Sequence, residues 1–105
     1  MNEKSPNIRI LRLQKRFQQS LQEMLVRGDV DTSLKYIHIC NIQLSKDLSH
    51  LKAYYELGVC CDQPADFYQT KLDESVPFIQ KMLKKKQFRR LPKIRFISQK
   101  KNVFL

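Results

Sequence analysis

The sequence predicts an α+β fold in which three strands pack, on one face of their sheet, against helices. Three observations predict it. Apolar residues recur every three or four positions in two long segments, 8–27 and 66–87. Three shorter segments carry the β-branched and aromatic residues that favour strands. The chain has 105 residues, which is enough for one ordinary domain and too short for two.

The first predicted helix runs from Ile8 to Arg27. Its apolar stripe consists of Ile10, Leu13, Phe17, Leu21 and Met24. Gly28 follows directly, and glycine readily adopts the left-handed conformation that ends many helices. Four cations lie away from the stripe on the first turns: Arg9, Arg12, Lys15 and Arg16. Cations near a helix N-terminus oppose the helix dipole and so cost some helix stability. This basic face is either a solvated surface or an RNA contact.

An antiparallel hairpin is predicted over residues 35–57. In its second strand, 49–57, the apolar residues alternate clearly with polar ones. In its first strand, 35–44, both faces carry apolar residues, so the pattern leaves the buried face open. The connecting turn contains Ser45 and Asp47, whose side chains can bond nearby backbone N–H groups.

The second helical segment, 66–87, keeps one apolar face but is interrupted by Pro77. Proline lacks an N–H and its ring clashes with the preceding turn, which predicts a kink or a restart near Ser75, and hence a kinked helix pair. After Leu91 and Pro92, the segment Lys93 to Ser98 is predicted to be the third strand. We therefore expect a polar tail over 1–7, one domain over 8–98 and a short tail over 99–105.

Positive charge dominates the composition and is unevenly distributed. Lys and Arg number 20 against 10 Asp and Glu, a formal net charge of +10. From Lys81 to Lys101 there are ten cations and no acid, whereas Asp62 to Glu74 contains four acids and one lysine. A domain this basic attracts polyanions such as RNA, DNA or an anionic membrane surface. The alternative is that the surplus lysines only keep the protein soluble.

Membrane insertion and export are not expected. No apolar run approaches the roughly 20 residues that cross a bilayer, and the start of the chain, MNEKSPN, lacks the apolar segment of a signal peptide. A cytoplasmic protein is expected, and its three cysteines, Cys40, Cys60 and Cys61, are then reduced thiols.

The residues offer little for catalysis or for a cofactor. Ser45, Asp47 and His50 have the side chains of a hydrolase triad but lie within one turn, whereas triads are assembled from separate parts of a fold. The adjacent pair Cys60–Cys61 does not have the spacing of zinc ligands. With only two glycines, the chain has no glycine-rich phosphate loop. We expect neither an enzyme, nor a metal site, nor a cofactor.

Binding is the remaining class of function. Lysine and arginine contact phosphates, while unpaired bases stack on aromatic or arginine side chains. Lysines gather at one end of the second helix, and Arg89 and Arg90 follow them. Phe88 between them is a candidate either to stack on a base or, as we favour, to anchor the helix end.

Four segments stand out together: the helix RILRLQKRFQQSLQEML, the hairpin NIQLSKDLSHLKAYYEL, the helix LDESVPFIQKML and the ending FRRLPKIRFI. They resemble a known family, ribosome-binding factor A, a bacterial factor for maturation of the small ribosomal subunit. The hairpin is similar to the family pattern Val-x-x-Ser-x-Asp-Leu-x-x-Ala-x-Val, and the ending to Arg-x-x-Pro-x-Leu-x-Phe. The four occur in the family's order and spacing over nearly the whole chain.

The resemblance implies a single type II KH-like domain with the order helix, strand, strand, kinked helix pair, strand. It also implies binding to the free 30S subunit through 16S rRNA, help in late maturation and 5′-end processing, and no catalysis. At the kink, where the family has Ala-x-Gly, this chain has Ser75, Val76 and Pro77. Proline removes an N–H that could meet a phosphate, so the main RNA contacts are expected from the cations that follow.

We therefore expect a monomeric, cytoplasmic RNA-binding protein without a membrane partner. The expected RNA-binding residues are Arg9, Arg12, Arg16, Lys81, Lys84, Lys85, Lys86, Arg89, Arg90 and Arg95. The alternatives are a generic basic KH-like RNA-binding protein and an adaptor for anionic surfaces without ribosomal specificity.

Overall fold

A computed structural model describes residues 6–99 of the chain. Its elements, in order, are α1 (Pro6–Arg27), the short 3-10 helix η1 (Thr32–Leu34), β1 (Ile37–Leu44), β2 (His50–Leu57), α2 (Ala65–Lys85) and β3 (Lys93–Ser98). This order confirms the predicted α+β class, and β3 has the bounds predicted for it. α1 begins two residues earlier than predicted, so Pro6 and Asn7 belong to the helix, while 1–5 and 100–105 of the predicted tails lie outside the described residues.

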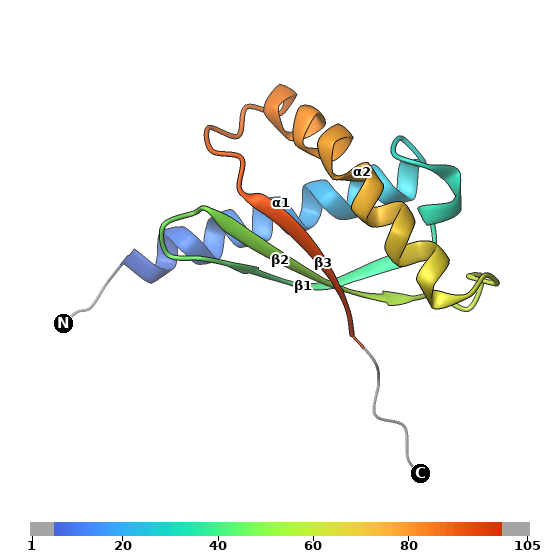
Figure 1. Ribbon diagram of the computed structural model, residues 1–105. Helices are drawn as coiled ribbons and strands as arrows, with labels where there is room; N and C mark the ends of the chain where they lie inside the picture. Colours follow the sequence, from blue (N-terminus) through green and yellow to red (C-terminus); the bar gives the residue numbers. More distant parts are fainter. Residues whose placement is uncertain (1–5, 100–105) are drawn as a thin grey trace, which may run out of the picture.

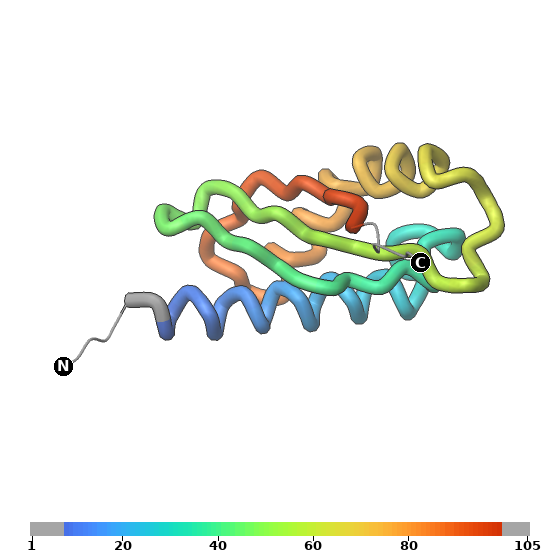
Figure 2. The backbone as a smooth tube through the Cα atoms, turned by 90° about the horizontal axis from the view of Figure 1, so that it is seen from below, coloured from blue at the N-terminus to red at the C-terminus, as the bar shows by residue number. Residues whose placement is uncertain are grey.

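The sheet has the strand order β1-β2-β3, with β1 antiparallel and β3 parallel to the central strand β2. Both helices lie on the same side of this sheet (Figure 1), and the view from below shows the strands with no helix in front of them (Figure 2). The burial of the strands follows this two-layer arrangement, since buried and exposed residues alternate along β2 and β3. Within residues 6–99, no helix therefore covers the outer face of the sheet.

An irregularity in β1 explains why the alternation in this strand is mixed in the sequence. Ile39 pairs with Tyr55 and Asn41 pairs with Tyr54, so Cys40 is an extra residue in a β-bulge. The bulge shifts the side-chain alternation by one position. Residues 37 and 39 are buried before it, and residues 42 and 44 are buried after it.

Both helices end in the same backbone motif. Residue Gly28 has φ of +77°, and the N–H groups of Gly28 and Asp29 donate to the carbonyls of Leu25 and Met24. At the end of α2, Gln87 has φ of +69°, and Gln87 and Phe88 repeat the pattern by donating to residues 84 and 83. These are Schellman motifs, in which one left-handed residue reverses the chain. Gly28 was predicted in this role, whereas glutamine has a steric penalty there.

The expected helix pair is a single helix. The prediction allowed a kink or a restart near Ser75. α2 runs without interruption from Ala65 to Lys85, so the restart is wrong, while the kink stays a prediction. Pro77 lies inside α2 and cannot donate to the carbonyl of Asp73, while the Ser75 hydroxyl donates to the Lys71 carbonyl at 2.7 Å. Val76 packs against the core. The helix continues because its remaining hydrogen bonds and its buried face outweigh the one bond lost.

The core lies between the sheet and the two helices. Its members come from every predicted apolar face, and the largest fully buried ones include Phe17, Leu21, Met24, Leu25, Leu34, Tyr55, Leu72, Ile79 and Leu83. No polar or charged residue of the described chain is buried. The cations of this part of the chain are therefore at the surface, where they can meet a partner.

Candidate nucleic-acid interface

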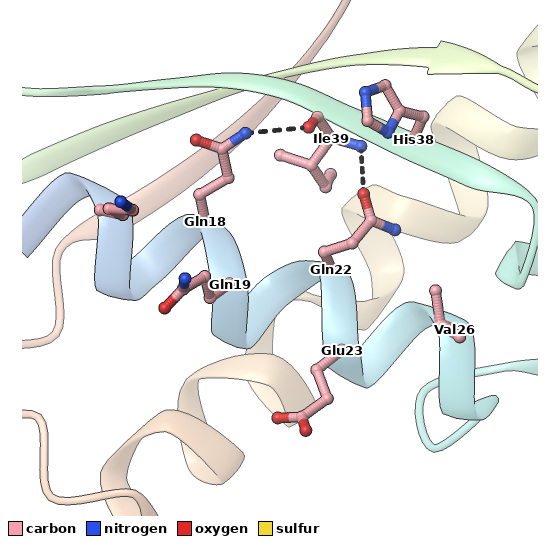
Figure 3. Close-up of a pocket in the computed structure, with 8 residues that line it drawn as sticks. Gln18, Gln19, Gln22, Glu23, Val26, His38 and Ile39 are labelled. Atoms are coloured by element: carbon pink, nitrogen blue, oxygen red, sulfur yellow. Dashed lines mark hydrogen bonds between the residues drawn. The ribbon is translucent and has the colours of Figure 1, made fainter.

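Three glutamines fix α1 along the free edge of the sheet. Gln14, Gln18 and Gln22 stand four residues apart and so share one side of the helix. Gln22 accepts from the Ile39 N–H at 2.8 Å, and Gln18 donates to the Ile39 carbonyl at 3.2 Å (Figure 3). Gln22 also donates to the Ile37 carbonyl at 3.0 Å. These amides satisfy backbone groups that an edge strand otherwise exposes.

The first part of α1 is held in the same way. The side chain of Gln14 accepts from the Leu44 N–H at 2.9 Å. Because this side of α1 is bonded to the strand, the arginines of its first turns point elsewhere. Arg9, Arg12 and Arg16 are all exposed.

A stack of two rings joins α1 to the segment after α2. Phe88 is 6% exposed, and its ring lies 4.4 Å from that of Phe17 between centroids, nearly parallel at 18°. The guanidinium of Arg16 covers the Phe88 ring at 4.5 Å from its centroid. Phe88 is therefore the predicted anchor of the helix end, and it places Arg89 and Arg90 beside the arginines of α1.

The hairpin turn between β1 and β2 is the third segment that meets here, beside α1 and the segment after α2. Arg90 donates to the carbonyl of Asp47 at 2.9 Å, which ties the segment after α2 to this turn. The turn itself is ordered by hydrogen bonds from the hydroxyls of Ser49 and Ser45 to the Asp47 carboxylate, which lower the pKa of Asp47 to about 2. At its tip Leu48 has φ of +64°, a strained conformation that brings its side chain against the core.

Together these three segments enclose what we name the basic groove. It consists of two adjoining hollows of about 450 and 390 Å³, which share the apolar floor residues Leu13 and Leu48. Its walls carry six cations: Arg9, Arg12, Arg16, Lys46, Arg89 and Arg90. Among the described residues that line it there is no acid. An apolar floor between arginines is suited to nucleotides, because the floor takes bases and the walls take phosphates.

The structure divides the ten residues predicted to bind RNA into three groups. Five of them line the basic groove: Arg9, Arg12, Arg16, Arg89 and Arg90. Four lie at the end of α2: Lys81, Lys84, Lys85 and Lys86. Of these, Lys86 forms an ion pair with Glu23 at 3.2 Å. The carboxylate of Glu23 therefore weakens the attraction of Lys86 for an anionic ligand. Arg95 lies apart, on the outer face of the sheet.

Several residues of the groove were not considered as binding residues, among them Gln87, Pro92 and, from the hairpin turn, Lys46 and Leu48. The sequence places Lys46 and Leu48 in that turn, and nothing in the local pattern connects the turn with Arg9 or Arg89. Only the fold brings the three segments together.

Ser45 and Asp47, which were considered as members of a catalytic triad, take part in the hydrogen bonds of the hairpin turn. The hydroxyl of Ser45 and the carboxylate of Asp47 bond each other and the backbone of the turn, as expected of turn residues. No group of three or more metal-ligating side chains occurs within residues 6–99. In the same part of the chain no helix has the length and apolar character to cross a membrane.

Comparison with solved structures finds the same fold in a known protein. The crystal structure of ribosome-binding factor A from Thermus thermophilus matches with a TM-score of 0.70 and 22% identity, over 84% of this chain and 93% of that one. A second match, with a TM-score of 0.66 and 23% identity over 82% of this chain and 90% of that one, is a homology model of the Thermus thermophilus factor as fitted into the cryo-EM map of a 30S–RbfA complex. At these identities the likeness establishes the fold.

Sequence comparison identifies the family. No curated protein sequence gives a significant match. The family model for ribosome-binding factor A, however, matches residues 9–102, which include α1 except its first three residues, all of α2, all three strands and the whole basic groove. The chain therefore belongs to the ribosome-binding factor A family.

Proposed function

We propose that this protein binds the free 30S ribosomal subunit in the cytoplasm, through 16S rRNA held in the basic groove, and assists late maturation and 5′-end processing. The family membership supports this proposal, as does the 30S complex into which the Thermus thermophilus factor was fitted. The observation that carries it is the groove itself, where six cations from three separate segments surround an apolar floor. The protein acts by binding, without catalysis of its own.

The arrangement of the groove favours a shaped RNA site over a diffuse positive surface. Arg16 and Arg90 are each held in place, one over the ring of Phe88 and the other on the carbonyl of Asp47. Fixed guanidinium groups lose less side-chain entropy when they bind phosphate. The lysines at the end of α2 lie outside the groove and would add attraction that salt screens.

The test is cosedimentation of the purified protein with free 30S subunits, 70S ribosomes and anionic vesicles at several salt concentrations. The expected result is retention on 30S subunits at moderate salt, and loss of this retention in the double variant Arg12→Glu, Arg89→Glu. The double variant Lys15→Glu, Lys35→Glu is the matched control, since it makes the same change of charge outside the groove. Unchanged 30S binding by the groove variant would contradict the proposal. Equal binding to every polyanion, lost together as salt rises, would favour the anionic-surface adaptor.

A further inference from the structure

The outer face of the sheet presents an ordered set of polar side chains. By strand register, Gln43, Lys52 and Arg95 form one row across the three strands, and all three are exposed. The adjoining row consists of Asn41, Tyr54 and Ile97. Figure 2 shows this side of the sheet without a covering helix.

Positive charge gathers at one end of this face. Lys52 and Arg95 lie side by side on β2 and β3, and Lys93, exposed on the same face, is the next outward residue along β3. The acid on this face within the described strands, Glu56, pairs with His38 at the opposite end and accepts from the Cys40 thiol at 3.1 Å. Like charges on neighbouring strands destabilise a sheet, so an anion placed over Lys52 and Arg95 relieves their repulsion.

An aromatic ring stands beside these cations. Tyr54 is half-buried on the central strand, between Asn41 and Ile97, and its hydroxyl donates to the Gln43 side chain at 3.3 Å. This bond restrains the ring in the row next to Lys52 and Arg95. Aromatic rings on a sheet surface with cations around them suit single-stranded nucleic acid, because bases stack on the ring while phosphates meet the cations.

We propose that this outer sheet face is a second RNA-binding surface, which takes a short unpaired segment with one base on Tyr54 and phosphates on Lys52, Lys93 and Arg95. The proposal rests on the proposed function for the nature of the ligand, RNA. The face lies on the side of the sheet opposite to α1 and α2, whereas the basic groove is built on α1. A molecule that uses both surfaces holds two RNA segments at once.

The proposal is tested by titrating isotopically labelled full-length protein with a short oligouridylate and following backbone amide shifts by NMR. Shifts are expected at residues 52–54 and 93–97 of the outer face in addition to those of the groove. Tyr54→Leu, which keeps a half-buried apolar side chain but no ring, is expected to weaken binding to the outer face about five- to hundredfold, the range for loss of a stacked base. Tyr54→Phe keeps the ring and should bind like the unaltered protein.

Charge gives a second readout with a matched control. Arg95→Glu should weaken oligouridylate binding more than Lys35→Glu, which makes the same change of net charge away from both surfaces. Shifts confined to the groove, or equal affinities of Tyr54→Leu and the unaltered protein, would overturn the second surface and leave the groove proposal standing. Failure of the groove proposal is recognised separately, by unchanged 30S binding of its own double variant.

Discussion

Replacing Phe88 separates the two roles that its ring could have, an anchor for the fold or a platform for a base. The side chain is 6% exposed and stacks on Phe17 at 4.4 Å. Truncation to alanine removes a buried aromatic side chain and leaves a cavity, which costs about 3 to 5 kcal/mol in the free energy of unfolding. For a chain of this size that loss lowers the melting temperature by roughly 15 °C or more.

Phe88→Leu is the more informative variant because it refills part of the site. Its cost is roughly 1 to 2 kcal/mol, since the apolar volume is partly kept and the lost ring pair is worth about 0.5 to 1.5 kcal/mol. The variant should therefore fold at 25 °C, which urea denaturation followed by circular dichroism can establish.

RNA affinity of the folded Phe88→Leu protein then decides between the roles. Both roles are compared in an Arg16→Ala background, because the Phe88 ring also holds the Arg16 guanidinium and its loss alone would weaken binding. In that background, removing an anchor changes the affinity for 30S subunits less than about twofold, whereas removing a ring that stacks on a base weakens binding about fivefold or more. A fivefold weakening there, in a protein that remains fully folded, would refute the assignment of Phe88 to the core.

Three further predictions concern the fold that supports the groove. Gln22→Leu should lower the free energy of unfolding by about 2 kcal/mol, because the Ile37 carbonyl and the Ile39 N–H both lose their partner. The control is Gln19→Leu, on the exposed side of α1, and equal urea midpoints for the two variants would disprove the role of Gln22. Gln87→Gly should raise the free energy of unfolding by about 0.5 kcal/mol, since glycine has no steric penalty at φ of +69°, and a lower melting temperature would contradict this. In the folded protein the pKa of Asp47 is lowered from 3.8 to about 2, so the contribution of this carboxylate to stability is present above pH 3.8 and is lost as the pH falls to about 2. Acid unfolding curves of the Asp47→Asn variant should lack this part of the pH dependence.

The elements of the fold could be predicted because each depends on a local pattern. The stripe of α1, its end at Gly28 and the bounds of β3 follow from periodicity and backbone preference alone. The face of β1 could not be predicted, because the bulge at Cys40 reverses the alternation within the strand. The continuity of α2 through Pro77 was missed as well, since packing of the whole helix outweighs one lost hydrogen bond.

The candidate site was predicted only in part, for a related reason. Arginines on α1 and after α2 are visible in the sequence as charge, but their meeting depends on the contact between Phe17 and Phe88, which are far apart in the chain. Lys46 enters the groove because Arg90 bonds the turn beside it. Arg95 is near Arg90 in sequence, but the strand places it on the outer face.

The central claim, that the arginines of the groove contact rRNA phosphates, is tested most directly by the salt dependence of 30S binding. Each phosphate contact contributes about −0.7 to −0.9 to the slope of log affinity against log salt concentration. The double variant Arg12→Ala, Arg89→Ala should therefore bind 30S subunits with a slope that is shallower by about 1.4 to 1.8 than that of the unaltered protein. Identical slopes for the two proteins would mean that these side chains contact no phosphate, and would contradict the account of the groove.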